Sequence, residues 1–118
     1  MISDFSFSKD TIGFMIEGKV TSQTIEKLNT LIIEKLDKFE KINLYLEDAN
    51  VDSVSIPALL KEMEFKVNYA SHFNKVAIVT NRTSLKIMVE IEKLIAAYEI
   101  EIFACEDRLK AMNWISEH

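Results

Sequence analysis

Three times in this chain, a short apolar run suited to a buried strand is followed by a segment with the spacing of an amphipathic helix. The clearest case begins at residues 42–46 (INLYL), passes through an acidic, serine-bearing segment at residues 47–55 that we expect to be a loop, and continues as a helix with Pro57 in its first turn. Proline fits there because the first N–H groups of a helix have no partner within it. Apolar periods that alternate between two and three-to-four residues predict an α/β domain.

The remaining segments complete this pattern. Phe5, Phe7, Ile12, Phe14 and Ile16 alternate with other residues around 8–11, which predicts an antiparallel hairpin ending at Gly18. Further strands are expected at residues 75–80 and 99–103, and helices at about 22–39, 56–72, 84–98 and after Asp107. The sequence therefore predicts one domain, 1–118, with a mixed sheet of about five strands, a hairpin followed by parallel strands, and four helices.

Each expected helix has an apolar stripe. In the first, Thr21 or Ser22 caps a stripe of Ile25, Leu28, Ile32, Leu36 and Phe39. In the second, the predicted stripe is Leu59, Leu60, Met63, Val67 and Ala70, and Phe65 lies off it.

The helix expected at residues 84–98 has a wider apolar arc than one contact with a sheet requires. One stripe is Ile87, Ile91, Leu94 and Tyr98, and the stripe beside it is Leu85, Met88, Val89 and Ile95. Either this helix is deeply buried, or the excess faces a partner subunit or lines an apolar ligand cleft with Met63 and Phe65.

Composition excludes several classes of function. The formal net charge is -5, and Lys and Glu are interleaved rather than clustered. This argues against nucleic-acid binding, which needs a basic face, and gives no polybasic patch for an anionic membrane. The single cysteine allows no internal disulfide, and we expect neither a signal peptide nor stable membrane insertion, because no apolar run reaches about 18 residues. The sequence predicts a cytoplasmic location.

Motifs for cofactors and metals are scarce. His72 and His118 are the only histidines, and no Cys/His cluster has the spacing of a metal site. Neither a G-x-G-x-x-G motif nor a P-loop is present. We expect no metal and no cofactor.

Polar residues follow the central strand and should meet those that follow the next strand, because the carboxyl ends of parallel strands share one edge. The candidate recognition site at this edge is Asp48, Asp52, Ser53, Ser55, Asn81 and Arg82. These residues either form turns and caps, with Ser55 capping the second helix, or a recognition or phosphoacceptor loop. An acid/base pair of two of these carboxylates is a third alternative. Cys105, before a helix, is either an inert small hydrophobe or a thiol with a lowered pKa.

Four phrases of the sequence carry a family resemblance. They are LYLED (44–48), PALLKEMEFKV (57–67), FNKVAIVTN (73–81) and IEIFACEDRLKAMNWI (100–115). With the order of elements, they resemble the STAS superfamily, the fold of anti-sigma-factor antagonists, and within it the SpoIIAA-like branch, which is also grouped with the CRAL-TRIO lipid-exchange fold. The resemblance covers nearly the whole chain and implies the same fold as the apolar periods.

In the antagonists that the chain resembles, a serine in an Asp-Ser-Ser/Thr-Gly phrase is phosphorylated by a partner kinase. Here Asp52 and Ser53 match the phrase, but Val54 and Ser55 follow, and no glycine does. Negative side chains already crowd this stretch and would repel a phosphate. We predict that phosphorylation is not this protein's switch.

Three functions stay open. The first is a non-enzymatic interaction or regulatory module that recognises a protein partner, not identified by the sequence, through the carboxyl-edge residues. The second is a carrier or sensor of an apolar small molecule or lipid, suggested by the CRAL-TRIO relationship and the wide third helix. The third is an enzyme using Asp48, Asp52 or Cys105. We favour the first, with a homodimer through Ile87, Ile91 and Leu94 as one form of interaction.

Overall fold

The computed structural model describes residues 1–117 except for the side chain of Phe7. The expectations for that side chain and for His118 therefore lie outside the described residues. The described elements are β1 (Ile2–Ser8), β2 (Thr11–Val20), α1 (Ser22–Leu36), β3 (Ile42–Val54), α2 (Ile56–Asn68), the 3₁₀ turn η1 (Ala70–His72), β4 (Phe73–Val79), α3 (Thr83–Lys93), β5 (Glu99–Phe103), the 3₁₀ turn η2 (Cys105–Asp107) and α4 (Arg108–Ser116).

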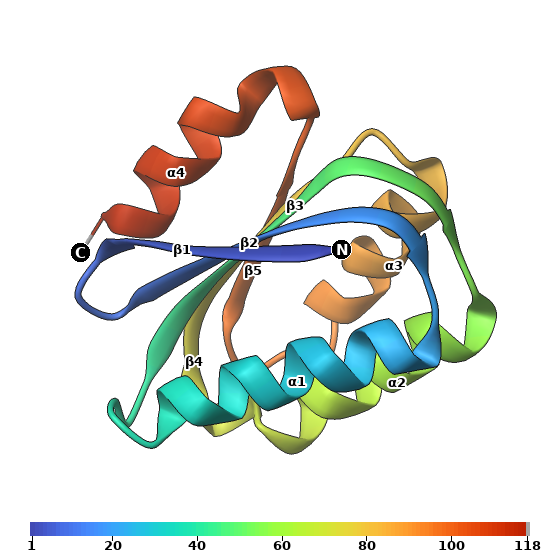
Figure 1. The fold of residues 1–118 in the computed structure, drawn as a ribbon. Coiled ribbons are helices and arrows are strands. Elements are labelled where there is room, and N and C mark those ends of the chain that lie inside the picture. The colour runs from blue at the N-terminus through green and yellow to red at the C-terminus, as the bar shows by residue number, and fades with distance from the viewer. Residues whose placement is uncertain (118) are drawn as a thin grey trace.

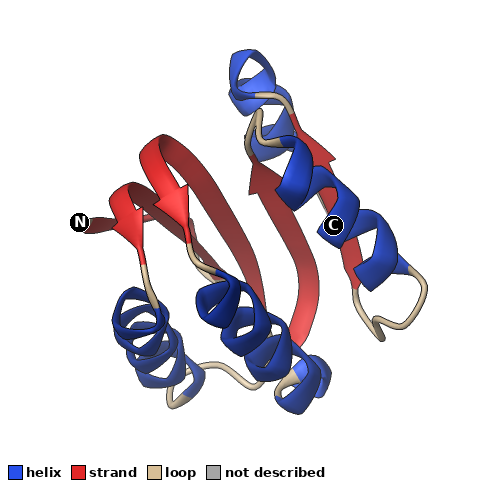
Figure 2. Ribbon diagram, turned by 90° about the vertical axis from the view of Figure 1, so that its right-hand side faces the viewer, coloured by secondary structure: helices blue, strands red, loops and turns tan. Residues whose placement is uncertain are grey.

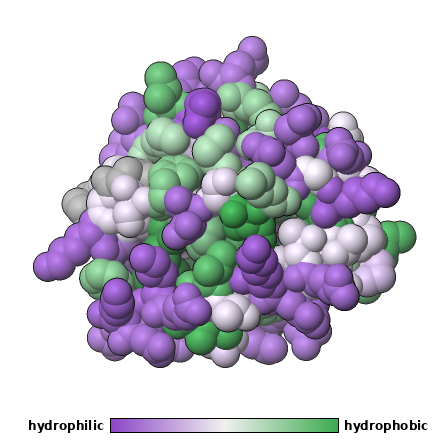
Figure 3. Space-filling model, viewed as in Figure 1, coloured by the Kyte–Doolittle hydropathy of each residue, from purple (hydrophilic) through white to green (hydrophobic). Residues whose placement is uncertain are grey.

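These strands form a sheet in the order β1-β2-β3-β4-β5. β1 and β2 are antiparallel, and every later pair is parallel. The prediction of a mixed sheet with β3 in its interior is confirmed, as are the four α-helices among the described residues. Seen from the side drawn in Figure 1, polar residues form the periphery and apolar residues gather across the middle, around the edge strand β1 (Figure 3).

The two faces of the sheet are covered unequally. α1, α2 and α3 cover one face, where Leu28, Phe65 and Val89 join a core with the inward side chains of the strands. α4 covers the other face, where Ala111 and Ile115 pack against a smaller cluster. Figure 2 shows α4, which ends near the marked C-terminus, across the sheet from α1 and α2. A residue's face follows from the two-residue period of the strands.

β3 corrects the largest error of the sequence analysis. The stretch 47–55 was expected to be a loop, but β3 continues to Val54. Its polar second half is a strand because the long β2 pairs with it as far as Val20 opposite Val54, with register shifts next to Ile16 and Gly18. Gly18 has a φ of +80°, in the left-handed region that glycine adopts readily. In Figure 1, β2 and β3 arch together toward α1 and α2.

α2 corrects a second prediction. Its side chains Ala58, Phe65 and Lys66 are buried, whereas Leu60 and Val67 of the predicted stripe are 63% and 56% exposed. Phe65, predicted to line a cleft, stacks on Tyr69 with ring centroids 4.6 Å apart within the core. The apolar pattern misled because the inward face of α2 includes a charged residue that has partners inside the protein.

The other helices follow the sequence more closely. Thr21 caps α1 in a capping box with Thr24, and Ile25, Leu28 and Ile32 are buried as predicted. Asp107 stands at the N-cap of α4, but its side chain makes no capping hydrogen bond. α3 ends at Lys93, earlier than the expected Tyr98.

Candidate functional site

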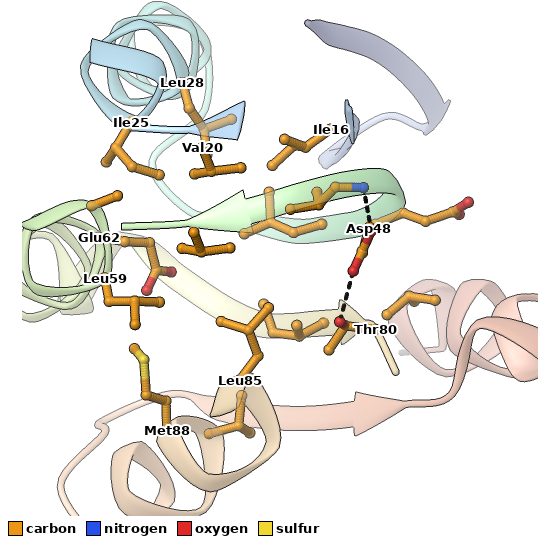
Figure 4. Close-up of a pocket in the computed structure, with 18 of the residues that line it drawn as sticks. Ile16, Val20, Ile25, Leu28, Asp48, Leu59, Glu62, Thr80, Leu85 and Met88 are labelled. Carbon is orange, nitrogen blue, oxygen red and sulfur yellow. Dashed lines mark hydrogen bonds between the residues drawn. The ribbon is translucent and has the colours of Figure 1, made fainter. Parts of the chain in front are cut away.

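A cavity of about 90 Å³ lies between the sheet and the three helices of the larger core. Its wall is mostly apolar, with contributions from β2, β3, β4 and each of α1, α2 and α3 (Figure 4). The polar and charged residues that take part in the lining are Glu47, Asp48, Glu62, Lys66, Thr80 and Glu92. An apolar wall with a few polar groups is typical of small-molecule sites.

The cavity lies where the sheet divides. The last residue pair in the register of β3 with β4 is Glu47 with Val79, after which β3 follows β2 away from β4. α1 packs on α2, while α3 packs on β5, so the helices separate along with the strands beneath them. Leu85 and Met88 of α3 face the cavity opposite Leu59 of α2 (Figure 4).

A buried charged group, here called the Lys66 cluster, forms one part of the wall. It consists of Glu62, Lys66, Glu92 and Tyr98. Lys66 Nζ lies 2.6 Å from Glu62 Oε1 and 2.9 Å from Glu92 Oε1, and the Tyr98 hydroxyl donates to Glu92 Oε2 at 2.5 Å. The side chains of Lys66 and Glu92 are each 3% exposed, and that of Glu62 is 18% exposed. Buried charges of this kind are stable only when they are paired.

The environment of the cluster shifts its pKa values. Burial raises the pKa of the Glu62 carboxyl; Lys66 opposes this effect and the negative charge of Glu92 adds to it. Burial alone would lower the pKa of Lys66, but attraction to both carboxylates outweighs burial and raises it. Burial and the hydrogen bond to Glu92 raise the pKa of Tyr98. The ammonium therefore stays charged at neutral pH, while burial disfavours ionisation of the Glu62 carboxyl.

Asp48 anchors the opposite part of the wall. Its Oδ1 accepts a hydrogen bond from the Val51 N–H at 2.9 Å, and its Oδ2 accepts one from the Thr80 hydroxyl at 3.1 Å (Figure 4). Arg82 Nε lies 3.6 Å from Asp48 Oδ2, and an Arg82 Nη donates to the Val51 carbonyl at 2.5 Å. These contacts tie the diverging part of β3 to the end of β4.

The structure brings together only part of the predicted recognition site. Asp48 and Arg82 pair, and Asn81 Oδ1 accepts a hydrogen bond from the Cys105 N–H at 3.0 Å, so these residues do meet at the carboxyl edge. Asp52 and Ser53 are exposed on the second half of β3. Ser55 caps α2, its Oγ accepting from the Ala58 N–H at 3.2 Å, as the capping alternative predicted.

The predicted apolar cleft residues lie elsewhere than the cavity. Ile87, Ile91 and Leu94 are exposed on α3, Met63 is partly buried, and Phe65 belongs to the core. The neighbouring stripe of α3, from Leu85 to Val89, is the one that lines the cavity. α3 therefore has one apolar side facing inward and another facing solvent.

The Cys105 thiol does not have the lowered pKa that one alternative required. Burial raises its pKa, and the charges of Asp48 and Glu47 add to this effect. The Sγ atom lies 3.7 Å from the Asp48 carbonyl oxygen. Burial, together with the nearby carboxylates, therefore keeps the pKa of this thiol raised although Cys105 begins the 3₁₀ turn η2.

Sequence analysis missed the Lys66 cluster. The only local signal was the spacing of Glu62 and Lys66, four residues apart on one helix, but such pairs are usual on exposed helix surfaces. The contact to Glu92 comes from another helix and leaves no trace in local spacing. Residues 1–117 contain no group of three or more His, Cys, Asp or Glu placed to hold a metal ion. In the same part of the chain, no helix combines the length and apolar character needed to cross a membrane.

Comparison with known proteins points to one family. A family model described as SpoIIAA-like matches residues 11–116. An uncharacterised protein of Shewanella loihica with a SpoIIAA-like fold superposes with a TM-score of 0.75 at 19% identity, over 98% of this chain and 92% of that one. The anti-sigma-factor antagonist SpoIIAA in its unphosphorylated form gives a TM-score of 0.64 at 7% identity, over 96% and 98%. No functionally curated protein matches the chain. At these identities, the two solved structures bear on the fold alone.

Proposed function

The chain belongs to the SpoIIAA-like family, and from that premise we propose that it is a non-catalytic STAS-like module that binds a small, mostly apolar molecule. The single observation that carries this proposal is the cavity of about 90 Å³ at the division of the sheet. Its size exceeds the roughly 10–15 Å³ that one water needs, and an apolar cavity of about 150 Å³ is known to stay dry and to bind benzene. Burial of the ligand's apolar surface would supply the affinity.

The polar residues at the cavity and beside it favour ligand binding rather than catalysis. Asp48 is engaged with Val51, Thr80 and Arg82, so it has little freedom to act as an acid or base. The Cys105 thiol has a raised pKa, which lowers the fraction of reactive thiolate. Regulation by ligand binding, or carriage of the ligand, fits these properties better than catalysis does. A cytoplasmic location stays a prediction.

Filling the cavity tests this proposal. Met88→Trp places a large side chain in the cavity, and Ile87→Trp is the matched control because Ile87 precedes it on α3 and is 57% exposed. We expect toluene to raise the melting temperature of the natural protein and of Ile87→Trp, but not that of Met88→Trp. Leu85→Phe is a milder filling variant should Met88→Trp fail to fold. Equal responses of filled and control variants to toluene would contradict the proposal.

A protein partner is the second candidate function. The observation that favours it is the outer side of α3 and the residues directly after it, where Ile87, Ile91, Leu94 and Ile95 are exposed by 57%, 51%, 83% and 65%. Exposed apolar patches often mark interfaces. If a second copy covers this side, Ile91→Glu with Leu94→Glu gives a monomer, whereas Lys86→Glu, an exposed change on the same helix, leaves the dimer intact. Sizing chromatography of the unmodified protein decides the matter, because a monomer at high concentration rules the dimer out.

A further inference from the structure

The Lys66 cluster contains an excess of negative charge beside the cavity. Glu62 and Glu92 share one ammonium, that of Lys66, at 2.6 and 2.9 Å. Glu92 has both oxygens engaged, since its Oε2 also accepts from Tyr98. Glu62 accepts nothing beyond its contact with Lys66 from the residues that the structure describes. The cluster thus holds two carboxylates and one cation, with Glu62 the less satisfied member.

Glu62 differs in this respect from Asp48, the carboxylate at the opposite part of the wall, which has Arg82 at 3.6 Å. The carboxylate of Glu47 lies on the α4 face of the sheet, where Arg108 is 3.3 Å away. The Glu62 carboxylate has no cation to itself, and its side chain extends from α2 into the space between α1, β3 and α3 (Figure 4). A ligand in the cavity would meet this carboxylate on a mostly apolar wall.

We propose that the ligand of the cavity is a small apolar molecule with one protonated amine, and that its ammonium binds Glu62. This inference rests on the proposed function, because it names the class of ligand for the same cavity. The ammonium brings a second cation to two carboxylates and so balances the buried charge. Its N–H groups donate charge-assisted hydrogen bonds to the Glu62 carboxylate, while the apolar body fills the space lined by Leu59 and Met88.

A carboxylate ligand is disfavoured by the same geometry. The cation that it would need, Lys66, is 3% exposed and already contacts two carboxylates. A third negative charge beside them would be repelled by both. A neutral alcohol would gain a hydrogen bond from the site but would leave the excess charge unbalanced.

A matched series of ring compounds tests the inference at pH 7. Benzylamine, benzyl alcohol, benzoate and toluene share one ring and differ in the polar group. Calorimetric titration of the natural protein should give benzylamine an affinity about tenfold above that of benzyl alcohol, the order of one charge-assisted hydrogen bond. We expect toluene to bind measurably and benzoate not to bind.

Substitution of the carboxylate then assigns the effect. Glu62→Gln should remove the preference for benzylamine while keeping toluene binding, and Glu64→Gln, exposed on the same helix, should keep both. Benzoate binding as tightly as benzylamine to the natural protein would overturn the inference, and this measurement needs no variant. Preference for the amine retained in Glu62→Gln would also overturn it. If toluene does not bind to the natural protein, the proposed function is contradicted, and the inference that rests on it is contradicted too.

Discussion

The two faces of the sheet carry the same arrangement, in which a tyrosine hydroxyl and a cation both contact one buried glutamate, but its surroundings differ. On the α4 face, the Tyr45 hydroxyl donates to Glu47, and Arg108 Nε lies 3.3 Å from the same carboxylate. On the face of the larger core, Tyr98 and Lys66 take these places around Glu92. The first group has one anion and one cation, whereas the second includes the additional carboxylate of Glu62.

This difference distinguishes a group that only stabilises the fold from one that can take part in ligand binding. Arg108 is 45% exposed, and the group on the α4 face adjoins a packed cluster that includes Ala111 and Ile115. Such a group attaches α4 to the sheet and needs no additional cation. The Lys66 cluster is almost wholly buried, has an unbalanced charge and adjoins a cavity. Two buried carboxylates that share one cation cost stability, so the Lys66 cluster beside the cavity supports the proposed ligand site, whereas the group around Glu47 attaches α4 to the sheet.

Removal of each cation should give the largest contrast. Lys66→Met leaves two buried carboxylates without a cation, and we expect it to lower the free energy of unfolding by about 3–5 kcal/mol. Arg108→Met, the matched change on the α4 face, should cost about 1 kcal/mol or less, because ion pairs that reach solvent contribute little. Urea denaturation followed by circular dichroism at pH 7 measures both. Equal losses would mean that the two groups do not differ in the way proposed.

Neutralising the additional carboxylate should have a smaller effect, and one that depends on pH. Because burial raises the pKa of Glu62 above its usual 4.5, the folded state holds this proton more tightly than the unfolded state. Its contribution to stability is fully present below pH 4.5 and is lost as pH rises through the folded pKa. The variant Glu62→Gln cannot lose this contribution, because it has no carboxyl to ionise. The free energy of unfolding of Glu62→Gln minus that of the natural protein should therefore increase from pH 4 to pH 8.

Comparison of the two proteins at each pH cancels the titration of the other carboxylates. Glu64→Gln is the control, since Glu64 is exposed on the same helix. A difference between Glu62→Gln and the natural protein that stays constant from pH 4 to pH 8 would show that Glu62 titrates alike in both states.

The apolar periodicity of the sequence predicted most of the fold, because the burial of side chains on a sheet determines that periodicity. The central strand, the hairpin and the strand at Glu99–Phe103 have apolar side chains at the spacing that the sheet requires. The second half of β3 escaped because its residues are polar and its strand character comes from pairing with β2, which is a tertiary contact. Sequence spacing alone gives no information on such a partner.

The candidate site was predictable only at its periphery. Ser55 was identified as a cap because capping depends on neighbouring residues, which the sequence shows. The inner face of α2 was misjudged because the predicted stripe contains only apolar residues, whereas Lys66 lies on that face and pairs with two carboxylates. The cavity itself results from the separation of β3 from β4 after Glu47, which no local pattern indicates.

The smallest effects are expected at the two serines near α2, the helix that carries Glu62 and Lys66. Ser55→Ala removes the hydrogen bond to the Ala58 N–H and should cost about 1 kcal/mol, whereas Ser53→Ala, at an exposed position on β3, should cost much less. Neither serine should carry phosphate: on Ser55 it would replace the cap, and on Ser53 it would join a strand end already acidic at Asp52. Urea denaturation measures the first two effects, and intact mass spectrometry of the protein from its own host measures the third. Stoichiometric phosphate on either serine would show that the side of the sheet with the cavity carries a phosphorylation switch. The contrast between a ligand-binding face and a purely structural face would then no longer hold.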